Sequence, residues 1–214
     1  MIIKNLFNTS ITCSSYYVNT ESNSTITITI KCTDFNGVPV VGQEINLYYD
    51  DATLLTTNNT NTNGEITYSY NCANDSRGVH TFTTDTGGLT QIQIYRDTGW
   101  QKPTFKSGYK DYNSSTDPLE YRVINNLVEI RGIFYNNSAV TPGNSNVNFA
   151  SIPVKYAPTQ KITLLQQGSG ANKFYVVILT DGNLAWSRYG TTTTTTQATA
   201  GSWLNCYAKY TIGV

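Results

Sequence analysis

Residues 121–134 read YRVINNLVEIRGIF, and this stretch decides the fold. Two apolar-rich segments, residues 121–124 and 127–134, flank Asn125-Asn126, and asparagine tolerates the positive φ that a two-residue hairpin turn requires. Side chains alternate between the two faces of a strand, so every second residue of the longer segment shares a face. The more apolar of its faces carries Val128, Ile130, Gly132 and Phe134. The stretch therefore predicts a β-hairpin that turns this face toward the core.

Two further motifs follow the hairpin, IPVKYAP at residues 152–158 and LTDGNL at residues 179–184. Together with Gly99-Trp100, the motifs resemble, in this order, the C-terminal β-domain of phage tail-fibre and baseplate receptor-binding proteins. The resemblance covers about residues 100–214. It implies that residues 99–214 form a jelly-roll-like β-sandwich fibre head that binds a host surface. It also implies a homotrimer with residues 204–214 near the axis.

The first part of the chain contains short strand patterns separated by turn clusters. Residues 25–32, TITITIKC, alternate strictly and predict isoleucine side chains facing inward and threonine side chains facing water. Further strands are predicted at residues 43–49, 66–72, 78–83 and 90–95, and residues 56–64, TTNNTNTNG, are predicted to be a polar loop. Short strands at a spacing of roughly ten residues indicate an immunoglobulin-like β-sandwich.

Three motifs of this first part carry a second resemblance. They are DFNGVPVVGQEI at residues 34–45, TNTNGEITY at residues 60–68 and GVHTF at residues 78–82. They resemble the bacterial Ig-like repeats of the invasin and intimin type, which are spacers and surface decorations without catalysis. The pattern occurs once rather than in tandem. The resemblance therefore implies that residues 1–98 mount the second domain on a larger assembly, here a virion.

The second domain also shows strand patterns throughout. Strands are predicted at residues 147–152, 161–166, 174–179, 184–189 and 203–212, and no segment has helical periodicity. Residues 191–196 are six consecutive threonines, either an exposed edge or a loop tip, and we favour the loop. The sequence therefore predicts an all-β protein: an N-terminal Ig-like β-sandwich followed by a C-terminal jelly-roll-like β-sandwich.

Composition and charge limit the classes of partner that the chain is expected to bind. The formal net charge is zero and charged residues make up 13% of the chain, so the electrostatic attraction that dominates nucleic-acid binding is weak. A neutral, aromatic-rich surface favours self-association. The N-terminus does not resemble a signal peptide, and no apolar stretch is long enough to cross a membrane. We expect a chain made in the host cytoplasm and incorporated into a virion, with no nucleic-acid partner and no membrane insertion.

The cysteine and histidine positions do not predict a metal site. Cys13, Cys32, Cys72 and Cys206 lack C-x-x-C spacing. Cys32 and Cys72 end antiparallel strands and should lie at opposite ends of the sheet, so we expect four reduced, mostly buried thiols. His80 is the only histidine, and we interpret it as an ordinary strand residue.

Paired carboxylates would be needed for glycan hydrolysis, and the second domain has several candidates. They are Asp111, Asp117, Glu120, Glu129 and Asp181. Turn signatures or polar strand positions account for each of them. The chain has no Walker loop, no G-x-S-x-G and no G-x-G-x-x-G motif, so we predict no catalytic residues, cofactor or metal.

Aromatic residues remain as candidates for binding, because aromatic rings beside polar side chains bind sugars without charge. In residues 186–190, WSRYG, strict alternation would place Trp186 and Tyr189 on opposite faces, so both cannot be fully buried. We therefore predict Trp186, Arg188, Tyr189 and Trp203 as glycan-binding candidates. The alternative is that the aromatic residues fill the core or an oligomer seam.

These observations favour a non-enzymatic phage virion protein, a tail or head fibre or decoration protein, that adheres to host-surface glycans. Its expected partners are other virion proteins, further copies of itself and a host glycan. Two alternatives stay open: a cell-surface adhesin or carbohydrate-binding module, and a capsid decoration protein with a purely stabilising role. A glycan depolymerase would require activity that depends on the carboxylates.

Overall fold

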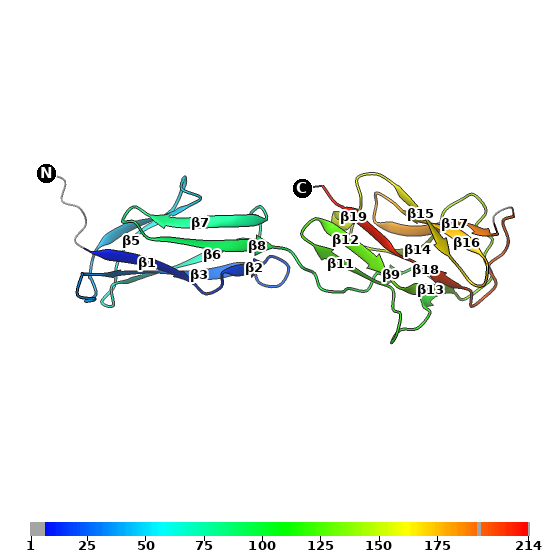
Figure 1. The fold of residues 1–214 in the computed structure, drawn as a ribbon, viewed down its shortest axis with the longest axis horizontal. Coiled ribbons are helices and arrows are strands. Elements are labelled where there is room, and N and C mark those ends of the chain that lie inside the picture. The colour runs from blue at the N-terminus through cyan, green and yellow to red at the C-terminus, as the bar shows by residue number, and fades with distance from the viewer. Residues whose placement is uncertain (1–6, 192–193, 214) are drawn as a thin grey trace. The chain divides into compact units, whose positions relative to one another are not determined.

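A computed structural model describes residues 7–191 and 194–213 and divides the chain into two compact units, Met1–Asp97 and Thr98–Val214 (Figure 1). The sequence placed the boundary between residues 98 and 99. Both units consist of strands, and the described residues contain no α-helix and a single short 3-10 turn, η1 (Val154–Tyr156). The prediction of an all-β fold is confirmed.

The first unit is built from two sheets around one core. One sheet has three strands in the order β1 (Asn8–Cys13), β3 (Thr25–Thr33) and β6 (Glu65–Asn71). The other sheet has five strands in the order β2 (Tyr17–Asn19), β8 (Leu89–Tyr95), β7 (Gly78–Thr84), β4 (Glu44–Tyr49) and β5 (Thr53–Asn59). The buried residues of both sheets form a single apolar cluster, as expected for a β-sandwich.

The alternation in β3 has the predicted effect. Ile26, Ile28 and Ile30 are buried, whereas Thr25 and Thr27 are exposed. Strands β3 and β6 are antiparallel, with Thr25 opposite Asn71 and Lys31 opposite Glu65. This register places Cys32 and Cys72 at opposite ends of the pair.

The cysteines have the predicted state. All four are free thiols, and three of them, Cys32, Cys72 and Cys206, are buried while Cys13 is partly buried. The prediction of four reduced, mostly buried thiols is confirmed.

The polar loop predicted at residues 56–64 is wrong over its first half, because β5 extends to Asn59. β5 lies at the edge of its sheet, where it pairs with β4 and where a strand needs few apolar residues. Its polar side chains bond across the pair: the Thr57 hydroxyl donates to Asn46 Oδ1 at 2.6 Å. β1 was not predicted either, since Ile11 is its one fully buried residue.

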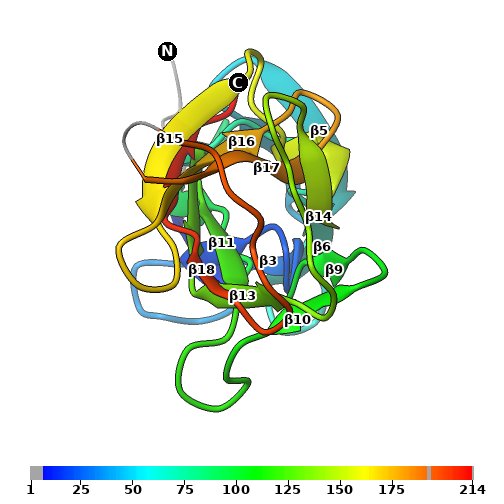
Figure 2. The same cartoon turned by 90° about the vertical axis from the view of Figure 1, so that its right-hand side faces the viewer.

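The second unit has one five-stranded sheet and two three-stranded sheets. The five-stranded sheet has the order β15 (Ile162–Gln167), β16 (Lys173–Ile178), β17 (Asn183–Gly190), β14 (Val147–Ser151) and β9 (Thr104–Phe105). The three-stranded sheets have the orders β11 (Glu120–Ile124), β12 (Leu127–Arg131), β19 (Ala208–Thr211) and β10 (Tyr109–Asp111), β13 (Ile133–Asn136), β18 (Trp203–Asn205). In Figure 2, β15, β16 and β17 lie on one side of this unit and β11, β13 and β18 on the other.

The predicted hairpin is present. Asn125 adopts a φ of 52° in the turn, and Ile124 faces Leu127 across it. Val128, Ile130 and Phe134 are buried, as the alternation predicted. The second segment is not one straight strand, however. Gly132, with a φ of 125°, separates β12 from β13, and the two halves belong to different sheets.

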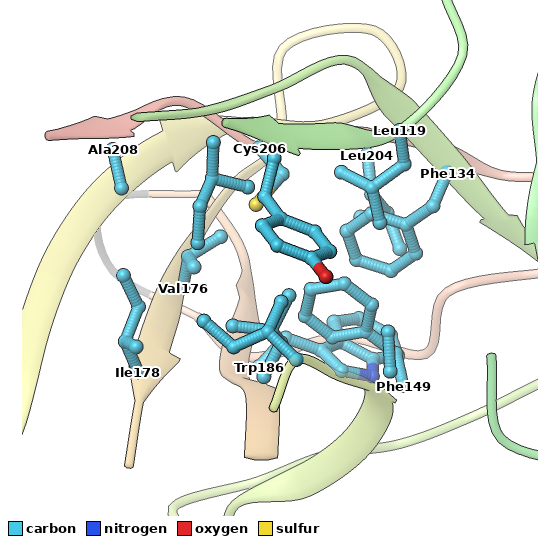
Figure 3. Packing of buried hydrophobic residues seen from close by; sticks show 14 of the residues in the cluster. Leu119, Phe134, Phe149, Val176, Ile178, Trp186, Leu204, Cys206 and Ala208 are labelled. Atoms are coloured by element: carbon cyan, nitrogen blue, oxygen red, sulfur yellow. The ribbon is translucent and has the colours of Figure 1, made fainter. Parts of the chain in front are cut away.

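The core of the second unit lies between the sheets. Figure 3 shows Phe134, Leu204 and Cys206 from one side pointing toward Phe149 and Trp186 from the other. The rings of Phe134 and Phe149 stack with their centroids 3.8 Å apart. This aromatic packing joins the sheets into a sandwich.

The threonine run lies beside β17. Thr191 and Thr194–Thr196 lie outside the named strands, although Gly190 and Thr195 form an isolated bridge. Thr192 and Thr193 fall outside the described residues. Within the described ranges, no helix has the length and apolar character to span a bilayer.

Candidate functional site

The end of β17 departs from strict alternation. Trp186, Ser187 and Tyr189 are all buried, with Trp186 at 0% and Tyr189 at 2% exposure, while Arg188 is exposed. The prediction that Trp186 and Tyr189 cannot both be fully buried is wrong. Both rings belong to the core cluster of the second unit.

A β-bulge at Arg188 is the physical reason. Tyr175 faces Ser187 and Lys173 faces Gly190, so three steps along β17 match two along β16. Arg188 takes up the extra residue with a φ of 53°, a left-handed conformation that is unusual for arginine. Its amide donates a hydrogen bond of 2.7 Å to the carbonyl of Gly143. The bulge turns Tyr189 back into the core and directs Arg188 outward.

Two of the three aromatic candidates, Trp186 and Tyr189, pack in the core of the second unit. Trp186 donates its indole N–H to the Tyr109 hydroxyl at 3.0 Å, and the Tyr189 hydroxyl accepts a hydrogen bond of 3.2 Å from Asn172 Nδ2. Trp203 is half-buried in β18, where its amide donates to Ser169 Oγ at 2.7 Å. Of the four predicted residues, the structure therefore leaves Arg188 as the exposed one.

Arg188 borders a surface groove with a cavity volume of about 320 Å³. Its base consists of Leu165, Lys173 and Tyr175 from the β15–β16 hairpin. Asn144 and three described threonines of the run complete its rim. The predicted loop of threonines therefore contributes to the same groove as Arg188. The described threonines of the rim are Thr191, Thr194 and Thr195.

Two residues of the base, Leu165 and Tyr175, form an apolar platform. Leu165 and Tyr175 face each other across the β15–β16 pair, and Leu165 is 58% exposed. The Arg188 guanidinium carbon lies 6.0 Å from the centre of the Tyr175 ring. Tyr175 is partly exposed, and a tyrosine face beside an aliphatic side chain can contact the apolar face of a sugar ring.

The groove carries positive charge. Lys173 and Arg188 both line it, and its described lining contains no carboxylate. Lys173 also lines a second hollow of about 400 Å³, whose other residues are Leu165, Gln166, Gln167 and Ala171. The two hollows share Leu165 and Lys173, so the concave surface continues along the outer side of the hairpin.

Sequence reasoning missed Tyr175, Lys173 and Asn144. Tyr175 lies between Phe174 and Val176, so alternation alone places it on the face opposite the core, and the hairpin register then sets it against Leu165. That signal was available in the sequence. The position of Asn144 depends on the bulge at Arg188, which the sequence pattern did not reveal.

His80 in the first unit is more than an ordinary strand residue. It is buried, and its Nε2–H donates to the carbonyl of Ser76 at 2.8 Å. Its Nδ1 lies 2.8 Å from Asp50 Oδ2 and 2.6 Å from the Tyr49 hydroxyl. Burial disfavours the charged imidazole, but the bonds to Asp50 and Ser76 outweigh this effect and raise the pKa of His80.

The candidate carboxylates have separate structural partners. Asp111 pairs with Lys102 at 2.7 Å, Glu120 with Arg131 at 3.5 Å, and Glu129 with Lys209. Asp181 accepts the amide of Asn183 at 3.0 Å, which lowers the pKa of Asp181, and Asp117 accepts the Thr116 hydroxyl. Over residues 7–191 and 194–213, no three His, Cys, Asp or Glu side chains gather as metal ligands would.

Comparison of the sequence with models of known protein families and with curated proteins finds no match in either case. The fold therefore defines the class of the protein: it is an all-β protein with several antiparallel sheets.

Proposed function

We propose that this chain is a non-enzymatic structural protein of a phage virion, a tail or head fibre or decoration protein, whose second unit adheres to glycans on the host surface. The two sequence resemblances support the virion assignment. The first unit serves as the docking domain on the particle, and the second unit as the exposed head.

The groove at Tyr175 is the observation that carries the adhesive role. It combines a partly exposed aromatic ring, an aliphatic neighbour at Leu165 and a rim of amide and hydroxyl groups. Proteins that bind sugars use the same combination, in which the ring covers the apolar face of the sugar and the polar groups bond its hydroxyls.

The full chain tests this role directly. On a panel of bacterial surface polysaccharides, the chain should bind at least one polysaccharide saturably, and Tyr175→Ala should abolish that binding while the protein stays folded. Tyr112→Ala is the matched control, because Tyr112 is 51% exposed and does not line the Tyr175 groove. Folded protein that binds no polysaccharide, or that binds equally well as Tyr175→Ala, would refute the adhesive role.

The virion assignment and the oligomeric state have their own tests. Antibodies against the chain should label intact particles, and light scattering should give the mass of a homotrimer, with residues 204–214 near its axis by analogy with the fibre-head family. A monomer at micromolar concentration would count against the trimer. A cell-surface adhesin, the alternative, would instead be encoded with an export signal or an anchor.

A further inference from the structure

We infer that the Tyr175 groove selects acidic saccharides, with Lys173 and Arg188 binding the carboxylate or phosphate of a sugar whose ring lies on Tyr175. This inference rests on the proposed glycan-binding role and names the class of glycan. Its basis is the charge of the groove, the backbone of Arg188 and the size and rim of the cavity.

No described residue neutralises the charge of the groove. The chain as a whole has 14 basic and 14 acidic residues, and several basic side chains elsewhere pair with carboxylates, as Lys31 does with Glu65 at 3.3 Å. In the described part of the chain, Lys173 and Arg188 form no ion pair, and no carboxylate lines their groove. An anionic ligand would supply the missing negative charge.

The backbone of Arg188 points to the same conclusion. A left-handed conformation suits glycine or asparagine and costs about 1 kcal/mol for other residues. Arg188 adopts it at a φ of 53° while its side chain is exposed and makes no hydrogen bond to a described residue. An arginine at this position therefore adds little to the stability of the fold. For a ligand, it supplies a guanidinium held beside the Tyr175 ring.

The chemistry of the guanidinium specifies the acidic group. Arginine presents a planar fork of N–H donors that matches the paired oxygens of a carboxylate or a phosphate. Lysine adds a second, more mobile positive charge. The shared requirement is an anionic oxygen group, which a uronic acid or a phosphodiester-linked glycan provides equally.

The size and the rim of the cavity fit a sugar rather than a bare ion. A volume of about 320 Å³ is at the lower end of the range of small-ligand pockets and suits one or two sugar rings. Asn144 and the threonine hydroxyls can bond the neutral hydroxyls of such a ligand. Thr191 and Thr194 approach each other with their Oγ1 atoms 3.0 Å apart, so one hydrogen bond already links two residues of the rim.

Calorimetric titration of the full chain can distinguish the contribution of the acidic group to binding from that of the sugar ring. The probes are an oligogalacturonate, the same oligosaccharide with its carboxyl groups reduced to alcohols, and a phosphodiester-linked oligosaccharide of hexose units. We expect at least one acidic probe to bind about tenfold or more tightly than the reduced probe, which corresponds to one charge-assisted bond. Its affinity should fall as sodium chloride is added, because salt screens the charges.

Two variants locate the effect. Arg188→Asn keeps a residue that tolerates the left-handed backbone but removes the guanidinium, so it should stay folded and lose the preference for the acidic probe. Lys161→Gln removes the same unit of charge from the other end of the hairpin, where Ile162 faces Ile178, and should bind as the unmodified chain does.

The outcomes distinguish this inference from the proposed function. Equal binding of the acidic and reduced probes, lost in Tyr175→Ala, would overturn the acidic selectivity and leave the glycan-binding role intact. An unchanged acidic preference in Arg188→Asn would also overturn the inference. Failure of the folded chain to bind any of the probes or any polysaccharide of the panel would overturn both.

Discussion

The amide of Cys206 donates a hydrogen bond of 2.9 Å to the carbonyl of Gly132. Gly132 separates β12 from β13, and Cys206 follows β18 before the chain enters β19. The two segments bend together at this bond, so β12 pairs with β19 in one sheet and β13 pairs with β18 in another. One hairpin-like pair thereby supplies strands to both three-stranded sheets of the second unit.

Gly132→Ala should destabilise the second unit by about 3 kcal/mol or more, because a buried steric overlap adds to backbone strain. A Cβ at this position would lie 2.1 Å from the carbonyl oxygen of Pro118, and the φ of 125° already disfavours other residues. Urea unfolding followed by tryptophan fluorescence measures the loss.

Two glycines serve as controls for this change. Gly201 has a φ of 79°, and a Cβ added there would meet no neighbouring atom of the described residues. Gly201→Ala should therefore reduce the free energy of unfolding by only about 1 kcal/mol, which measures the cost of the backbone conformation alone. A Cβ added at Gly213 would lie 3.8 Å from its nearest neighbour, Cγ2 of Thr159. The free energy of unfolding of Gly213→Ala should therefore be within about 0.5 kcal/mol of that of the unmodified protein. If Gly132→Ala costs no more than Gly201→Ala, the close approach to Pro118 is not a determinant of stability.

Trp186→Ala should cost about 3–5 kcal/mol, the usual loss for removing a large buried aromatic side chain. Trp186 is fully buried and its ring lies 6.0 Å from that of Phe174 in an edge-to-face arrangement. Chemical denaturation gives the free energy of unfolding. The matched change Tyr207→Ala, at a residue that is 51% exposed, should cost less than about 1 kcal/mol. Equal losses would contradict the core position of Trp186.

The alternation of apolar and polar residues predicts the strands correctly where one face of a strand is buried and the other is exposed to solvent. In β3 the alternation specified which side chains point inward, and in the 121–134 hairpin it specified the turn as well. The same rule failed in β17, because a single left-handed residue reverses the faces beyond it. It failed for β5 because an edge strand is held by polar cross-strand bonds rather than by buried apolar residues.

The site was predictable only in part for the same reason. Arg188 was predicted from the strand alternation of residues 186–190, whereas Tyr175 became evident once the β15–β16 register was known. The approach of Asn144 to Arg188 comes from chain segments far apart in sequence and depends on the Arg188–Gly143 hydrogen bond. Long-range approach of this kind leaves no local sequence pattern.

The four thiols should be slow to react in the native protein and fast after unfolding, because the thiolate is the reactive species. Burial raises the pKa of Cys206 to about 12 and that of Cys13 to about 11. Ellman's reagent at pH 8 measures the rates, and Cys13, which is partly exposed, should react first. Fewer than four thiols in unreduced protein after denaturation would contradict the free state of the cysteines.

The first unit should lose stability as the pH rises above about 6.5, the ordinary pKa of histidine. The pKa of His80 is raised in the folded state. The charged imidazole therefore contributes its full stabilisation at pH values below the pKa of the unfolded state, and this contribution is lost as the pH rises past the pKa of the folded state. The charged Nδ1–H donates to Asp50, whereas the neutral ring accepts from Tyr49 instead.

Since His80 is the only histidine, a single imidazole NMR signal reports its titration directly. We expect a midpoint above about 6.5 and a pH dependence of unfolding in this range that is reduced in His80→Gln. A midpoint below that value would show that burial, rather than the bond to Asp50, controls the protonation of His80.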